Sequence, residues 1–169
     1  METTSDSVGS SDNLSVIGWR EWVTLPQLGI HQIKAKVDTG ARTSAIHAFD
    51  VDYFEENGCL MVHFKVHPLQ RDTKLSIPVT ASVLEKRQVR NSGGQAQERP
   101  VIQTSVALGT QVWPIELTLT NRDVMGFRML LGREAVRRRF LVNPGSSYLL
   151  SAAPASESAD EEIDEFNVL

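Results

Sequence analysis

Apolar and polar residues alternate with a period of two along several short stretches of the chain. Such alternation is typical of strands with one buried face, because successive side chains point to opposite faces of a sheet. The clearest stretches are 32–37, 60–67, 75–83 and 115–119. Turn-forming sequences separate the stretches, at 26–29, 56–58, 91–94, 108–109 and 143–145. The spacing predicts an all-β chain folded as a barrel or a sandwich.

A single segment has helical character. Residues 133–140 contain good helix formers, have neither Gly nor Pro, and follow a glycine. We therefore expect one short helix near the end of a chain that is otherwise built from strands.

Composition divides the 169 residues into a domain and two flanking segments. Residues 1–13 are rich in Ser, Thr, Asp and Gly, and residues 151–169 combine small residues with an acidic run. Both segments are predicted to be disordered. They flank a single domain at 14–150, which is an ordinary length for one domain.

The charge is distributed unevenly along the chain. The whole sequence has a net charge of −4, yet residues 14–150 hold 17 basic and 12 acidic residues and carry +5, whereas residues 151–169 carry −6. No stretch approaches the ~20 apolar residues that span a bilayer, and the first residues do not resemble a signal peptide. We expect a cytoplasmic protein without a membrane partner.

Cysteine and histidine content argues against a metal centre. Cys59 is the sole cysteine, which excludes an intrachain disulfide and a site built on paired thiolates, and we expect it to be buried. His63 and His67 would lie ~13 Å apart on one strand, too far to chelate one ion. Together with His31 and His47 they are interpreted as structural residues, and no metal or other cofactor is expected.

The most informative motif is Asp38-Thr39-Gly40-Ala41, which follows an apolar strand. By itself it is consistent with a simple turn, because Asp and Gly are common turn formers. A second segment, Met-Leu-Leu-Gly-Arg-Glu at 129–134, is another apolar strand that ends in glycine and precedes the expected helix.

These two segments together resemble the retropepsin family of aspartic peptidases. The likeness covers roughly 17–150 and is greatest to small bacterial proteins encoded beside RimK-type ATP-grasp glutamate ligases, which have Lys-Ala-Lys-Val-Asp-Thr-Gly-Ala-Arg-Thr at 34–43. Such proteins have been labelled ATP-dependent zinc proteases. The sequence contains neither a phosphate-binding G-x-x-x-x-G-K-[ST] loop nor a zinc-binding H-E-x-x-H motif, and so does not support that label.

The resemblance implies a closed acid-protease barrel in which two crossing loops expose Asp38 as the catalytic residue. Two carboxylates are needed to share a proton, and the chain has one Asp-Thr-Gly, so the active form is expected to be a homodimer. The family pattern assigns Thr39, Gly40 and Ala41 to the active-site loop, and Gly132 and Arg133 to its structural support.

Basic residues around this motif predict an acidic substrate. Viral retropepsins carry an acid directly after the alanine, whereas this chain has Arg42, and guanidinium groups bind carboxylates bidentately. A polar hairpin at 87–99 is a candidate flap whose arginines, including Arg87, would add positive charge, or alternatively a solvated loop. The candidate substrate-binding residues are Arg42, Thr43, Arg90 and Arg99.

We therefore interpret the chain as a homodimeric aspartic peptidase that hydrolyses glutamyl or other acidic segments, such as glutamate tails on a ribosomal protein. The alternative is a non-catalytic β-barrel module that binds an acidic tail or regulates a RimK-type ligase. The basic run at 137–139 favours a solvated surface over RNA binding, and no direct nucleic-acid partner is expected.

Overall fold

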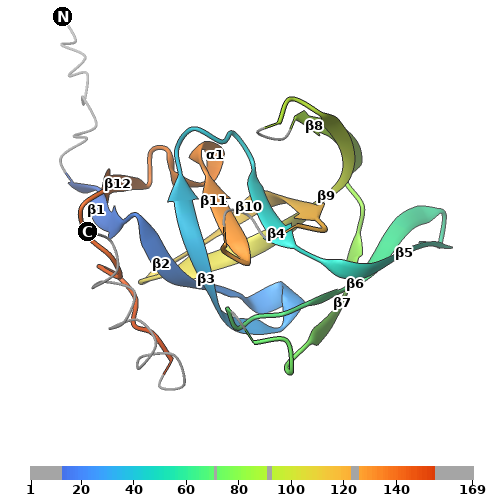
Figure 1. Cartoon of the computed structure of the whole chain (residues 1–169), viewed down its shortest axis with the longest axis horizontal. Coiled ribbons are helices and arrows are strands. Elements are labelled where there is room, and N and C mark those ends of the chain that lie inside the picture. The colour runs from blue at the N-terminus through green and yellow to red at the C-terminus, as the bar shows by residue number, and fades with distance from the viewer. Residues whose placement is uncertain (1–12, 71, 91–92, 123–125, 155–169) are drawn as a thin grey trace, which may run out of the picture.

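The computed structural model describes residues 13–70, 72–90, 93–122 and 126–154. Strands dominate these residues, in agreement with the alternating pattern (Figure 1). The strands are β1 (Ser15–Gly18), β2 (Arg20–Leu25), β3 (Ile30–Asp38), β4 (Ser44–His47), β5 (Phe49–Glu56), β6 (Cys59–Val66), β7 (Ile77–Ser82), β8 (Glu85–Arg90), β9 (Ala96–Leu108), β10 (Gln111–Thr120), β11 (Met129–Gly132) and β12 (Phe140–Asn143). A 3-10 turn, η2 (Pro26–Leu28), and a helix, α1 (Arg133–Val136), complete the described elements.

The largest sheet closes into a barrel. Its strand order is β10-β4-β11-β3-β2-β9-β8, and β9 also pairs with β10, which joins the two sides of the sheet. The apolar positions of β3, and of β6 in a neighbouring sheet, belong to one core as predicted, because Ile33, Val62 and Phe64 are fully buried. Lys34, predicted on the polar face of β3, is buried as well. The expected all-β architecture with one short helix is confirmed.

Two hairpins extend from the barrel. β5, β6 and β7 form a separate three-stranded sheet, and the β5–β6 hairpin projects from one side of the molecule (Figure 1). β8 and the first half of β9 form the second hairpin, which arches away from the barrel near the Asp38 end of β3 (Figure 1). This second hairpin is the segment predicted as a flap, although residues 91 and 92 at its turn lie outside the described residues.

The beginning and the end of the described domain are held together. β1 and β12 pair in parallel, with Ser15 opposite Phe140. The segment after β12 lies along β2, where the carboxylate of Glu21 accepts hydrogen bonds from the backbone N–H of Leu149 at 2.9 Å and of Leu150 at 2.6 Å. Glu21 is fully buried. Burial raises its pKa, and the backbone hydrogen bonds oppose part of that rise.

Two predictions about local structure are wrong. Cys59 is exposed, because it follows the turn at Asn57–Gly58 and begins β6 at the tip of the projecting hairpin, away from the core. The helix expected over 133–140 ends at Val136 instead. Arg138 has a φ of 65°, which a continuing helix cannot accommodate, and Phe140 begins β12. Within the described residues, we find no helix with the length and apolar character needed to cross a membrane.

Candidate active site

Asp38 is the last residue of β3, where the strand leaves the sheet and the chain turns. One carboxylate oxygen, Oδ1, accepts hydrogen bonds from the backbone N–H of Gly40 at 2.9 Å and of Ala41 at 3.2 Å. A Cβ on Gly40 would lie 3.2 Å from the same oxygen, so glycine leaves room for this tight approach. The side chain is partly exposed and fixed in direction by its own loop, which leaves Oδ2 available for chemistry.

Gly132 lies directly beside this loop. β11 runs parallel to β3 with Gly132 opposite Asp38, and it separates β3 from β4. A Cβ on Gly132 would come within 2.7 Å of the Thr43 carbonyl carbon and 2.9 Å of the Ser44 nitrogen, both backbone atoms. Its N–H donates to Ser44 Oγ at 3.0 Å. The close approach of two backbones therefore explains the glycine that the motif contains.

The first residues of α1 hold the carbonyl groups of the Asp38 loop. The N–H of Arg133 donates to the Ala41 carbonyl at 2.7 Å, and the N–H of Glu134 donates to the Arg42 carbonyl at 3.1 Å. Because the first N–H groups of a helix have no partner within it, the loop supplies the acceptors they require. The Arg133 guanidinium adds a third bond, from Nη1 to the Thr39 carbonyl at 3.1 Å. The loop is thus braced along its length.

Thr39 and Arg42 are both exposed in the single chain. Their carbonyl oxygens accept the bonds just described, so the structure places their backbones in the loop support and their side chains at the surface.

Arg87 connects the candidate flap to this site, a contact that sequence reasoning missed. From β8, its Nη1 donates to Thr43 Oγ1 at 3.3 Å, and its Nη2 contacts Glu116 at 3.0 Å and also Glu85. The hydrogen bonds that Arg87 donates to Glu85 and Glu116 raise its pKa. Its charge is compensated within the chain, contrary to the expectation that it adds positive charge to the cleft. The Glu85-x-Arg87 spacing, which puts both side chains on one face of a strand, is the signal that could have revealed this.

Arg90 and Arg99 lie on opposite faces of the β8–β9 hairpin. Arg99 is directly opposite Arg87 in the antiparallel register, and Arg90, three residues further along β8, projects from the other face. Arg90 is exposed, whereas Arg99 is partly buried. The two predicted substrate-binding arginines therefore do not form one cluster.

The histidines join aromatic and backbone partners. The His67 ring stacks on Phe49 with 4.2 Å between centroids, and its Nδ1 lies 3.1 Å from the Leu75 carbonyl oxygen. His47 Nδ1 lies 3.3 Å from the Arg128 guanidinium, and His63 Nδ1 lies 3.0 Å from Thr80 Oγ1. Among the residues that the structure describes, no three His, Cys, Asp or Glu side chains gather in a way that could hold a metal ion.

The basic run at 137–139 is partly engaged with the protein itself. Arg137 pairs with Glu134 at 3.3 Å, and the Arg139 guanidinium lies 5.2 Å from the Trp113 ring centroid. Trp113 is buried and donates from Nε1 to the Ala135 carbonyl at 3.0 Å, so it belongs to the core.

A closed β-barrel with an Asp-Thr-Gly loop braced by a Gly-Arg segment defines the retropepsin-like class of aspartic peptidases. The family model described as RimB-like, "Retropepsin-like aspartic endopeptidase RimB", matches residues 16–152. The chain belongs to this RimB-like family, and the resemblance inferred from its motifs is confirmed.

Curated relatives of the chain are longer proteins. Two of them, both named "Probable alpha-L-glutamate ligase", come from Shewanella pealeana, with 43% identity over 155 residues, and Parasynechococcus marenigrum, with 50% over 135 residues. These matches cover 92% and 80% of this chain but 33% and 29% of the relatives. The chain therefore spans about a third of the length of the curated relatives it matches.

A solved structure has a similar fold. A Legionella pneumophila protein described as of unknown function matches with a TM-score of 0.65 and 26% identity, over 81% of this chain and 98% of that chain.

Proposed function

We propose that this chain is an aspartic peptidase that acts as a homodimer, with Asp38 of each subunit meeting at the two-fold axis. The observation that carries the proposal is the fixed Asp38 carboxylate, whose Oδ1 accepts two backbone N–H bonds in an exposed loop. One Asp-Thr-Gly per chain makes half of a dyad, so the second carboxylate must come from another copy.

The chemistry follows from two carboxylates that share one proton. The ionised carboxylate removes a proton from water, whose oxygen attacks the carbonyl carbon of the substrate, while the protonated carboxylate donates a hydrogen bond to the carbonyl oxygen. The carbon–nitrogen bond then breaks and the departing amine takes up a proton. In this proposal Thr39, exposed on each loop, contacts its counterpart across the axis.

We further propose glutamyl or other acidic segments as the substrate class, such as glutamate tails added to a ribosomal protein by a RimK-type ligase. The +5 charge of residues 14–150 and the exposed Arg42 beside Asp38 support an acidic substrate. The names of the two curated relatives, both probable glutamate ligases, support an association with the enzyme that forms such tails.

The decisive experiment compares wild-type protein with Asp38→Asn on a peptide ending in a run of glutamates, with products followed by mass spectrometry. Asp38→Asn should abolish cleavage while leaving the fold and the dimer intact. Asp52→Asn, on the exposed strand β5, removes the same charge elsewhere and should cleave normally. Equal turnover by wild type and Asp38→Asn contradicts the proposal.

Mixing the two proteins tests the requirement for two chains. If subunits exchange freely and each site needs both aspartates, adding an equal amount of Asp38→Asn should lower the wild-type activity to about half. Unchanged activity would show that one chain suffices.

A second candidate function is a non-catalytic module that binds an acidic tail or regulates a glutamate ligase. The observation that favours it is that the curated relatives carry this domain within longer proteins named as ligases. It predicts that wild type and Asp38→Asn bind the acidic peptide equally and that neither cleaves it.

A further inference from the structure

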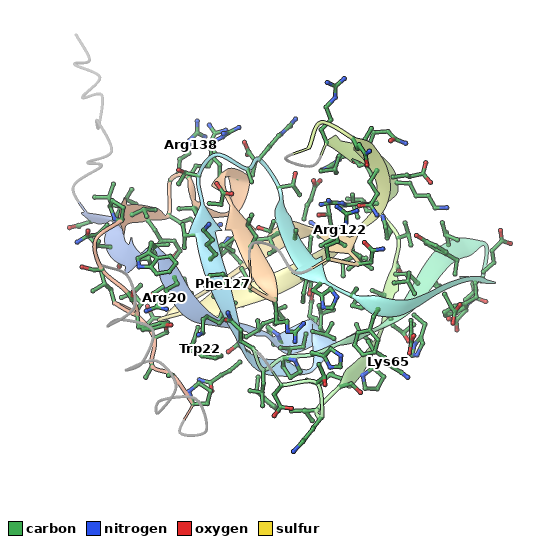
Figure 2. All side chains as sticks on the ribbon, viewed as in Figure 1. Arg20, Trp22, Lys65, Arg122, Phe127 and Arg138 are labelled. Carbon is green, nitrogen blue, oxygen red and sulfur yellow. The ribbon has the colours of Figure 1, made fainter. Side chains whose placement is uncertain are left out.

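Two arginines that are distant in sequence come together at the base of the candidate flap. Arg99 belongs to β9, and Arg122 follows β10, where its backbone N–H donates to Thr120 Oγ1 at 3.4 Å. The β9–β10 ladder ends where Val101 pairs with Thr118, so Arg99 and Arg122 both lie just beyond the same end of that ladder. Figure 2 shows Arg122 beside β4, beneath the arch of β8 and β9.

Arg99 lies on the same face of the hairpin as Arg87, the residue that contacts Thr43 of the active-site loop. Its direct partner in the register is Arg87, whose guanidinium reaches Thr43, five residues after Asp38. Residues opposite each other in an antiparallel pair project to the same side of the sheet. The side chain of Arg99 is therefore on the face that looks toward the Asp38 loop.

The charges of these arginines differ in how they are compensated. Arg87 is neutralised by Glu85 and Glu116. Among the described residues, no carboxylate forms an ion pair with Arg99 or Arg122, and the side chain of Arg99 donates one hydrogen bond, from Nε to Gln97 Oε1 at 3.4 Å. Within the described part of the chain, the terminal nitrogens of Arg99 have no hydrogen-bond or ion-pair partner.

The electrostatic environment is unfavourable for the protein without an anion. Burial lowers the pKa of Arg99, and the positive charge of Arg122 lowers it further. Two neighbouring guanidinium groups with one partly removed from water repel each other, and a bound carboxylate would offset both costs while accepting bidentate hydrogen bonds.

We propose that Arg99 and Arg122 together bind a carboxylate of the substrate and thereby determine specificity for acidic peptides. This inference rests on the proposed peptidase function. It assigns Arg122 to substrate binding and separates Arg99 from Arg87, which braces the flap. The carboxylate is either a glutamyl side chain or the α-carboxylate at the peptide terminus, which have the same recognition chemistry.

The test uses three peptides and the full chain. The first ends in a run of glutamates, the second has glutamines in their place, and the third is the first with its terminal carboxyl amidated. Arg99→Gln and Arg122→Gln should each lower kcat/KM on the glutamate peptide about tenfold to hundredfold, mainly through KM, because each loses a charged hydrogen bond. If the bound group is a glutamyl side chain, neither variant should alter kcat/KM on the glutamine peptide. If it is the α-carboxylate, neither should alter kcat/KM on the amidated peptide.

Controls separate charge recognition from structural damage. Arg99→Lys should recover part of the loss because it retains the positive charge. Lys74→Gln removes one charge from an exposed loop and should behave as wild type. If wild type loses kcat/KM to the same extent on the amidated peptide alone, the α-carboxylate is the bound group. If it does so on the glutamine peptide alone, the glutamyl side chain is the bound group. Equal losses on all three peptides, or no loss, overturn the proposal.

Binding measurements distinguish this proposal from the peptidase function on which it rests. If wild-type protein cleaves none of the peptides, the peptidase function fails, and binding of the same peptides is measured by calorimetry. The carboxylate site is upheld if wild type binds the glutamate peptide more tightly than the peptide that lacks the recognised carboxylate, and if Arg99→Gln and Arg122→Gln each remove this difference. Binding that is independent of both arginines overturns it.

Discussion

Replacing Gly132 by alanine places a methyl group where the backbone of the Asp38 loop runs. The new Cβ would lie 2.7 Å from the Thr43 carbonyl carbon and 2.9 Å from the Ser44 nitrogen, distances that real Cβ atoms essentially never show. Backbone strain at the residue itself is excluded, since its φ of −83° and ψ of 171° suit any residue. The whole penalty therefore comes from pushing β11 and the start of β4 apart.

The expected cost follows from this geometry. Overpacking in a well-packed region costs about 1–3 kcal/mol, and partial loss of the hydrogen bond from Gly132 to Ser44 Oγ adds up to about 1 kcal/mol. We expect Gly132→Ala to lower the free energy of unfolding by about 2–3 kcal/mol. For a domain of this size that corresponds to a fall in Tm of roughly 8–12 °C.

Urea titration and thermal scans followed by circular dichroism measure this change. Gly145→Ala is the matched control, because its Cβ would be 3.4 Å from Asn143 Oδ1, an ordinary contact, and its stability should stay within about 0.5 kcal/mol of wild type. If the proposed function holds, cleavage of the glutamate peptide should fall more steeply than stability does, since a displaced loop moves Asp38. If Gly132→Ala unfolds at the wild-type urea concentration, the close approach is not rigid and the reasoning is refuted.

Three further substitutions test other contacts. Burial raises the pKa of Glu21, so the folded protein keeps this proton to a higher pH than the unfolded chain. The free energy of unfolding should therefore fall as pH rises from about 4.5 through the raised pKa. Urea titrations across pH should show this slope in wild type and not in Glu21→Gln. Arg133→Met removes the hydrogen bond to the Thr39 carbonyl and should lower both kcat and, by about 1 kcal/mol, the free energy of unfolding. An unchanged kcat would show that this bond does not position the Asp38 loop. Arg87→Met should lower the free energy of unfolding by no more than about 1 kcal/mol, because its ion pairs are partly exposed. It should nevertheless raise KM, because the flap loses its contact with Thr43. An unaltered KM would show that this contact does not affect substrate binding.

The sequence predicted the strands best where one face is buried. β6 follows its alternation closely, since a slip of one residue would turn every apolar side chain outward. In β3 the alternation is less strict, because Lys34 is buried between Ile33 and Ala35. Cys59 was misplaced because residue type alone does not reveal that a hairpin tip projects beyond the core. The sequence predicted too long a helix at α1, because the pairing of β12 with β1 overrides the helix propensity of the residues after Val136.

The candidate site was predictable only in part. The Asp-Thr-Gly motif and the later Gly-Arg pair were visible as motifs, and the resemblance related them to each other. The position of Arg122 was not predictable, because its approach to Arg99 depends on the register of β9 and β10 rather than on any local pattern. The compensation of Arg87 likewise depends on Glu116, which lies on a different strand.

The position of β11 between β3 and β4 has a consequence for how the protein folds. β3 and β4 are separated by a short loop, yet they cannot form a simple hairpin, because a strand synthesised about ninety residues later must be inserted between them. Contacts of such long sequence separation are formed at a high entropic cost and are typical of slow folding. A nascent chain released from the ribosome as far as β10 would carry the Asp38 motif without its support. Assembly of the braced Asp38 loop is therefore delayed until almost the entire domain has been made.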